Sequence, residues 1–214
     1  MLSLLLDSSN VNLCVGISKD NELVYKTSYP CFQRQSEEMI PEIKKALDTL
    51  NLELLDFDEV VYGKGTGSYT GRRITMTIGK GPGSYTGLRI SMTIAKIICQ
   101  LSNAKLKLVS SLRIMGNSNK KFIALMNARS NRSYIGVYNF DKVELEDQIM
   151  TNDQVREYIN KHPDYELIGD LGYLQVDAIP ADEVNGLLSF KDLVEEENDV
   201  LKVKPIYLKE NYGI

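Results

Sequence analysis

The sequence predicts an α/β protein with two lobes, in which a mixed sheet and its flanking helices form the first lobe. Three observations lead to this fold class. The chain has 214 residues, enough for one large or two small domains with a substantial core. Apolar residues alternate in the first segments and then change to helical spacing. Strands and helices follow again in the second half, which we expect to form a reduced second lobe.

Three strands are predicted before the first helix. Leu2–Leu6 is a continuous apolar run, Val11–Ser18 alternates apolar and polar residues, and Glu22–Ser28 follows a short polar turn. Short turns of this kind join antiparallel strands. The next segment, Ser36–Leu50, has apolar residues at helical spacing along one wide face, and Ser36 is the expected N-cap.

A tandem repeat follows, in which one 16-residue unit occurs twice. Gly63–Ile78 and Gly79–Ile94 differ at three positions. Removal of either copy leaves one strand–loop–helix, with Val60–Tyr62 as the strand and Leu88–Gln100 as the helix. Ile74–Ile78 alternates with threonines and is a second candidate for the strand. We expect Val60–Tyr62 to be the strand, because it follows a helix and an acidic turn at ordinary loop lengths, and Gly63–Ile78 to be the extruded copy.

The second half contains shorter elements, from which we predict a smaller lobe. The expected strands are Lys107–Ser110, Phe122–Asn127, Ser133–Phe140 and Glu166–Gly169. The expected helices are Thr151–Lys161, capped by Thr151 or Asn152, and part of Val184–Glu195, with Phe190, Leu193 and Val194 inward. Glu195–Asp199 is an acidic turn, and Val203–Leu208 is extended because Pro205 excludes a helix interior. The predicted domains are residues 1–108 and residues 109–214.

Composition limits the range of functions. A net charge of −4 and a pI of about 5.2 argue against a chain that binds nucleic acid on its own. No apolar run in the sequence approaches the length of a membrane span. The three cysteines, Cys14, Cys31 and Cys99, are widely spaced, which favours buried thiols in a reducing compartment over a disulfide framework or a metal site. We therefore expect a cytoplasmic protein without membrane contact.

Two loops are candidates for phosphate chemistry. Gly79–Gly87 would place backbone N–H groups at a helix N-terminus, but its spacing matches neither the Walker nor the dinucleotide pattern, so a tight connection is favoured. Asp7 ends the first strand and resembles the first phosphate hairpin of the actin/Hsp70/sugar-kinase fold. A phosphotransferase would need a second carboxylate loop, for which only Gly169–Gly172 is available, so a hairpin turn is favoured. Direct nucleotide contact, if any, would come from Asp7, Ser8, Gly83, Ser84 and Thr86.

Other catalytic groups are scarce. The single histidine, His162, precedes Pro163 at the end of a predicted helix, and a site with two histidines cannot form within the chain. We predict no catalytic residue and no metal site. The helices Ser36–Leu50 and Leu88–Gln100 have wider apolar faces than one packing side requires. Either both faces are buried in the lobe, or their exposed portions pair with helices of another protein.

Six segments of the sequence resemble the bacterial TsaB (YeaZ) family, in the same order over nearly the whole chain. The most specific is GPGSYTGLR within Gly79–Lys96, and the others are Leu2–Ile17, Arg34–Leu47, Val109–Leu112, Met126–Tyr138 and Pro205–Lys209. The resemblance implies the actin-like (ASKHA, ribonuclease-H-like) fold and a non-catalytic relative of TsaD. It also implies that the chain pairs with TsaD, and with the ATPase TsaE, to make N6-threonylcarbamoyladenosine beside the anticodon of tRNA. The family commonly has histidine where Gln35 stands.

The same resemblance implies the partners and the interface. The expected interface residues lie on the two N-terminal helices and are Glu37, Ile40, Ile43, Leu47, Leu88, Arg89, Met92 and Lys96. The chain would have no cofactor of its own, with ATP/ADP and Mg in the assembled complex, would be a homodimer in isolation, and would meet tRNA only through the complex. The alternative is an enzyme, a small kinase or acyl-transferase that uses Asp7 and the Gly79–Gly87 loop. Nucleotide binding with turnover by the isolated chain would favour the enzyme.

Overall fold

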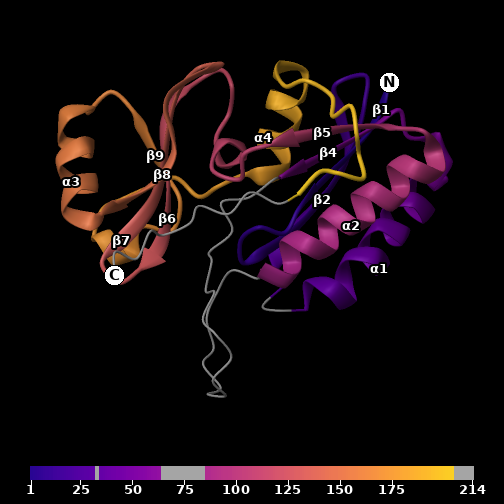
Figure 1. Ribbon diagram of the computed structural model, residues 1–214, viewed down its shortest axis with the longest axis horizontal. Helices are drawn as coiled ribbons and strands as arrows, with labels where there is room; N and C mark the ends of the chain where they lie inside the picture. Colours follow the sequence, from indigo (N-terminus) through magenta and orange to yellow (C-terminus); the bar gives the residue numbers. More distant parts are fainter. Residues whose placement is uncertain (32–33, 64–84, 205–214) are drawn as a thin grey trace.

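The computed structural model describes residues 1–31, 34–63 and 85–204, and the side chains of residues 85–90 are not described. These residues form two sheets with helices packed on them (Figure 1). The first sheet has the strand order β3-β2-β1-β4-β5, and the second has the order β8-β7-β6-β9. Within the described residues, no helix is long and apolar enough to cross a membrane.

The first sheet is mixed, as predicted. Its strands are β1 (Leu2–Asp7), β2 (Asn12–Lys19), β3 (Glu22–Pro30), β4 (Glu59–Gly63) and β5 (Lys105–Val109). β1, β2 and β3 pair antiparallel, whereas β1–β4 and β4–β5 pair parallel. Of the two candidate strands before the glycine loop, Val60–Tyr62 lies in β4, which confirms that prediction. Ile74–Ile78 and most of the repeat lie outside the described residues.

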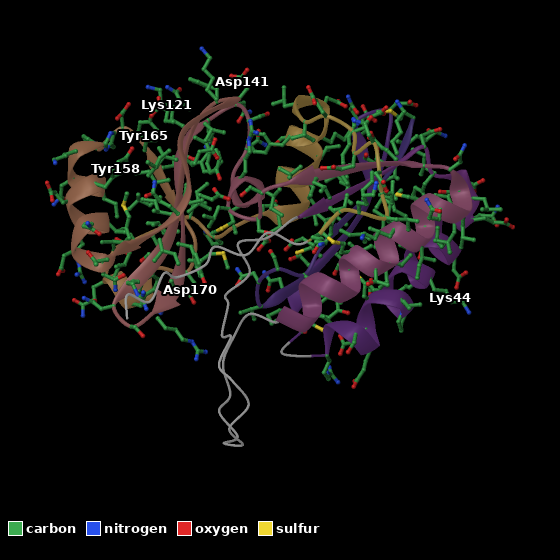
Figure 2. The ribbon with its side chains drawn as sticks, in the orientation of Figure 1. Lys44, Lys121, Asp141, Tyr158, Tyr165 and Asp170 are labelled. Atoms are coloured by element: carbon green, nitrogen blue, oxygen red, sulfur yellow. The ribbon has the colours of Figure 1, made fainter. Side chains whose placement is uncertain are left out.

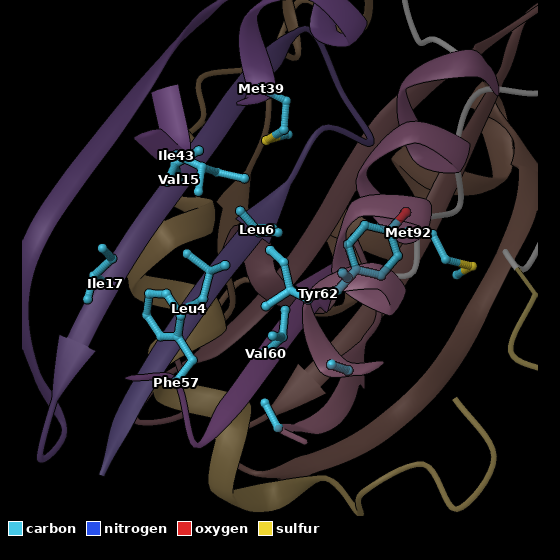
Figure 3. Close-up of a cluster of buried hydrophobic side chains, with 14 of the residues drawn as sticks. Leu4, Leu6, Val15, Ile17, Met39, Ile43, Phe57, Val60, Tyr62 and Met92 are labelled. Atoms are coloured by element: carbon cyan, nitrogen blue, oxygen red, sulfur yellow. The ribbon is translucent and has the colours of Figure 1, made fainter. Parts of the chain in front are cut away.

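Helices cover both faces of the first sheet. Side chains alternate between the faces of a strand, so Leu4 and Leu6 point to one side of β1 and Leu5 to the other. Leu4 and Leu6 pack in one core cluster with residues of α1 (Gln35–Leu50) and α2 (Tyr85–Ser102). Figure 3 shows Met39, Ile43 and Met92 of these helices in that cluster. Leu5 packs in a second cluster with α4 (Glu183–Phe190), which returns from the C-terminal half of the chain.

The predicted N-cap of the first helix is wrong. Arg34 occupies the N-cap position and no side chain caps α1, whereas Ser36 lies exposed in the first turn. The Arg34 N–H donates to the Cys31 carbonyl, and the Arg34 carbonyl accepts from the N–H groups of Glu37 and Glu38. The chain therefore turns into the helix before it reaches Ser36. A short 3-10 helix, η1 (Leu54–Asp56), connects α1 to β4.

The second sheet is built around a hairpin. Its strands are β6 (Lys121–Arg129), β7 (Arg132–Asn139), β8 (Lys142–Thr151) and β9 (Glu166–Ile168), and α3 (Asn152–Lys161) packs against β7 and β8. The sequence does not predict β8. Thr151 caps α3 as predicted: its hydroxyl accepts from the Gln154 N–H at 3.3 Å, and the Gln154 side chain accepts from the Thr151 N–H at 3.0 Å, which is a capping box.

The C-terminal segment returns to the first sheet through α4 and the 3-10 helix η4 (Lys191–Leu193). Phe190 is buried as predicted, but Leu193 is 46% exposed and does not point inward. Lys191 is buried instead. Its ammonium group can be buried because it lies 2.9 Å from the carboxylate of Glu59 in β4. The proposed division into residues 1–108 and 109–214 stays a prediction.

Candidate functional site

The candidate site lies where the parallel strands of the first sheet end. Asp7 is the last residue of β1 and is 0% exposed. Its Oδ2 atom accepts hydrogen bonds from the Ser9 N–H at 3.2 Å and the Ser9 hydroxyl at 2.9 Å. Its Oδ1 atom has no hydrogen-bond partner among the described residues. A Cβ atom at Gly63, the end of β4, would lie 2.1 Å from Oδ1, so only glycine fits beside this carboxyl group.

Burial sets the protonation state of Asp7. Desolvation is the main cause that raises the pKa of Asp7 from 3.8 to about 8, and the nearby Glu183 carboxylate adds to the rise. The Asp7 carboxyl group is therefore mostly protonated at neutral pH. A hydrated cation at this carboxyl group would also need room for its water molecules, and the Asp7 side chain is fully buried.

Glu183 is a member of the site that sequence reasoning missed. It lies in the first turn of α4, is buried, and accepts a hydrogen bond from the Cys14 thiol at 3.8 Å. Burial raises the pKa of Glu183, and burial together with the two carboxyl groups raises the pKa of Cys14. The contact joins residues 169 positions apart in the sequence. No local pattern in the sequence predicts it.

The residues predicted to contact a nucleotide are turned inward or not described. The Ser8 and Ser91 hydroxyl groups are hydrogen-bonded to each other, and both residues are buried between β1 and α2. Gly83 and Ser84 lie outside the described residues, and the Thr86 side chain is not described. In the described ranges, no cluster of three or more His, Cys, Asp or Glu residues could hold a metal ion.

His162 has a structural environment at the end of α3. Its ring stacks on Tyr158 at 4.2 Å between ring centroids, and Tyr165 meets it edge-on at 5.7 Å. Its Nδ1 atom lies 2.8 Å from the Tyr158 carbonyl oxygen. Figure 2 shows Tyr158 and Tyr165 at the end of the molecule occupied by α3, far from the first sheet. His162 therefore packs the second sheet and does not reach Asp7.

The predicted interface residues have different environments. Met92 is 3% exposed, and Ile43 and Leu47 are also buried, so these three side chains are packed inside the chain itself. Ile40 is 60% exposed, and Glu37 lies beside it on the exposed side of α1. The side chains of Leu88 and Arg89 are not described.

Two exposed apolar residues of α2 were not singled out for the interface from the sequence. Ile97 is 52% exposed and Leu101 is 64% exposed. Ile97 adjoins the buried Ile98, and Leu101 stands three residues beyond Ile98, so apolar spacing alone does not mark either residue as exposed. Ile40, Ile97 and Leu101 place exposed apolar side chains on two helices that lie side by side in Figure 1.

A second polar cluster lies between the two sheets. The Ser110 and Tyr138 hydroxyl groups both donate to the Asp147 carboxylate, and the Arg113 guanidinium lies 4.5 Å from the centroid of the Phe190 ring. Desolvation raises the pKa of Asp147 and of Tyr138. These contacts connect the end of β5, the hairpin β7–β8 and α4, so the cluster fixes the sheets against each other.

The two mixed sheets and their flanking helices, with Asp7 at the end of β1, are consistent with an actin-like, ASKHA-type α/β protein. Two solved structures from Pseudomonas aeruginosa have this fold: a protein described as similar to the peptidase YEAZ, at a TM-score of 0.75 and 18% identity, and YeaZ, at 0.72 and 17%. Each comparison covers 97% of this chain and 99% of the other. The family model for TsaD, the tRNA N6-adenosine threonylcarbamoyltransferase, matches residues 76–164.

Two curated relatives share the name tRNA threonylcarbamoyladenosine biosynthesis protein TsaB. The Bacillus subtilis protein is 24% identical over 150 residues, which is 68% of this chain and 58% of the relative. The Buchnera aphidicola protein is 32% identical over 75 residues, 35% of each chain. The matched stretches thus span less than two thirds of the length of either relative. The relatives, the solved structures and the family model agree in what they resemble: the chain is similar to TsaB/YeaZ proteins and to part of the TsaD family model.

Proposed function

We propose that the chain takes part in the biosynthesis of N6-threonylcarbamoyladenosine in tRNA as a non-catalytic partner of TsaD. The names of both curated relatives and the family model support the pathway. Under this proposal TsaE joins the assembled complex, and ATP/ADP and Mg belong to that complex. The chain contacts tRNA only as part of the complex. The isolated chain forms a homodimer and resides in the cytoplasm.

The burial of Asp7 is the observation that carries the non-catalytic role. A carboxylate that holds a hydrated magnesium ion has to be ionised and open to solvent. Asp7 is 0% exposed, Ser9 is hydrogen-bonded to one of its carboxyl oxygens, and Gly63 lies against the other. The competing kinase or acyl-transferase would require this group to be exposed, and the site would have to open before it could act.

Exposed apolar residues on α1 and α2 support a helix-mediated partner surface. In a complex, the large side chains of Ile40, Ile97 and Leu101 would become buried. Removing their apolar surface from water would stabilise the complex. When two helices of different proteins pack together, the contact is formed by apolar residues three and four positions apart in the sequence. We propose that TsaD binds across this face, and that the homodimer uses the same face when TsaD is absent.

The test is reconstitution with TsaD and TsaE of the same organism. Ile97→Glu places a charge on the proposed surface, and we expect loss of co-purification with TsaD and loss of modified tRNA, with an unchanged melting temperature. Val143→Glu, at an exposed apolar position of β8, is the matched control and should leave both intact. Full modification activity with Ile97→Glu would contradict the proposed surface.

The enzyme alternative has its own test. Purified chain is incubated with ATP and magnesium, without any partner, and hydrolysis or group transfer is measured. We expect no turnover. Turnover that is abolished in Asp7→Ala, a substitution at the buried carboxyl group, would overturn the non-catalytic role.

A further inference from the structure

The acidic segment after η4 lies against the first sheet, although the sequence indicates only a turn there. Residues 195–203, which we call the strap, run beside β5 and then along α2, as the yellow trace in Figure 1 shows. The Glu197 N–H donates to the Leu106 carbonyl at 2.8 Å, and Lys107 and Glu196 form an isolated antiparallel bridge. Because β5 is the last strand of its sheet, the strap covers an edge that would otherwise offer unpaired backbone groups.

Lys96 holds the far end of the strap. Its ammonium group donates to the Leu201 carbonyl at 2.8 Å and to the Val203 carbonyl at 2.6 Å. A lysine ammonium has three donors and no acceptor, and two of the three donors of Lys96 are used by the strap backbone. Lys96 belongs to the interface set predicted from the sequence, but here it binds a segment of its own chain. The contact joins α2 to residues more than one hundred positions away.

The remaining contacts of the strap are weak ones. Lys105 lies 2.7 Å from Glu196, and both side chains are exposed, so water and salt screen the pair. Val200 and Val203 are half-buried against the first core cluster. The other side chains of the strap are mostly exposed: Glu195, Glu196, Asn198, Asp199, Leu201 and Lys202. Segments with few buried contacts open locally at a much lower free energy than the whole fold.

We propose that the β5 edge and the Lys96 side of α2 form a docking surface for an extended acidic chain, and that the strap is its releasable occupant in cis. The surface offers a backbone edge, a cation for main-chain carbonyls and a second cation, Lys105, for an acidic side chain. The strap matches all three. Release would uncover β5 and would free the flank of the helix that carries Ile97 and Leu101.

Hydrogen exchange on the full chain tests the clamp. We expect Lys96→Met to speed exchange of the amides of residues 197–203 by about tenfold or more, with no change in β1 and β4. Lys96→Arg keeps donors for both carbonyls and should stay near the wild type. Lys44→Met removes a lysine from the exposed side of α1, where Figure 2 shows it, and is the control. Unchanged exchange with Lys96→Met, or equal acceleration in the strap and in β1, would overturn the proposal.

A peptide tests the surface itself. The double variant Val200→Asp/Val203→Asp weakens only the strap, and its release is verified by exchange. A labelled peptide with the wild-type sequence of residues 194–204 should then bind this variant and not the wild type, and Lys96→Met added to the variant should abolish binding. Absence of peptide binding by a variant with a released strap, or equal binding by the wild type, would contradict a surface occupied in cis.

Discussion

The carboxyl group of Asp7 is protonated in the folded chain over a wide pH range. Its pKa is raised from 3.8 to about 8 by burial and by Glu183. The unfolded chain releases this proton near pH 4, whereas the folded chain keeps it until about pH 8. The folded state thus binds more protons in between, and the free energy of unfolding falls as pH rises, by up to about 1.4 kcal/mol per pH unit.

Asp7→Asn should remove this dependence, because an amide resembles the protonated acid and does not titrate. We expect the variant to lose less stability than the wild type between pH 4 and pH 8, and to be the more stable protein at pH 8. Urea unfolding at several pH values measures both curves. Asp141→Asn, at an exposed site labelled in Figure 2, should follow the wild type. Parallel curves for Asp7→Asn and the wild type would show that Asp7 ionises normally.

Glu59 and Lys191 form a fully buried ion pair at the opposite end of the strands. Burial alone would raise the pKa of Glu59, but hydrogen bonds from Ser3, Lys107 and Lys191 bring it below its ordinary value. The Lys191 ammonium lies 2.9 Å from Glu59 and is 0% exposed. The pair joins η4 to β4 and precedes the strap in the sequence.

Lys191→Met should destabilise the fold by about 3–5 kcal/mol, because it removes one partner and leaves a buried carboxylate with fewer donors. Glu59→Gln/Lys191→Met should recover part of the loss, since neither charge is then buried. Chemical denaturation of the four chains of this double-mutant cycle gives the coupling energy. If Lys191→Met costs no more than exposed lysine variants such as Lys44→Met, the pair contributes nothing to stability.

At the scale of elements, α4 approaches the connection between the two sheets very closely. A Cβ atom at Gly186 would lie 1.8 Å from the carbonyl oxygen of Ile114 in η2 (Arg113–Met115). Gly186→Ala should therefore push α4 away and cost about 1–3 kcal/mol, in spite of the better helix propensity of alanine. Gly172→Ala is the matched control, because its nearest atom is 3.8 Å away. Equal melting temperatures for the two variants would contradict the close contact.

The sequence predicts well those elements whose buried residues recur at a regular spacing. α1 and the strands around Val15 and Ile123 bury one face or both, and alternation or helical spacing marks them. β8 is an edge strand in which no side chain is fully buried, so its alternation of apolar and polar residues is weak. The pairings of Asp7 with Glu183 and of Lys96 with the strap depend on the packing of distant segments. Local propensity carries no signal for such contacts, which is why sequence reasoning missed Glu183 and the contact of Lys96 with the strap.

At the scale of the whole molecule, one core cluster connects the two sheets. Phe122 of β6 lies 4.9 Å from Tyr138 of β7 and 6.4 Å from Phe190 of α4, measured between ring centroids. The same cluster includes Leu5 and Val61 of the first sheet. Because interiors are close-packed, the sheets cannot separate without loss of these contacts. The cluster therefore holds the two sheets together as one packed unit.

The tandem repeat predicts that one of its two copies can be deleted without loss of the fold. Deletion of residues 63–78 places Gly79 directly after Tyr62, so a glycine still ends β4 beside Asp7, and the second copy still leads into α2. The matched family region, residues 76–164, contains the second copy entirely and only the end of the first. A shorter loop changes the closure entropy little, roughly 0.6 kcal/mol per doubling of length. We expect the deletion to preserve or raise the melting temperature, to improve solubility and to retain TsaD binding.

Deletion of residues 79–94 is the matched control, because it removes the same length. It leaves Thr75 in the place of Ser91, a buried residue whose hydroxyl bonds to Ser8. The added methyl group would overpack this site, at a cost of about 1–3 kcal/mol. We therefore expect the second deletion to melt at a lower temperature than the first. If the deletion of residues 63–78 fails to fold, or loses TsaD while the full chain binds it, the first copy is a structural part of the fold.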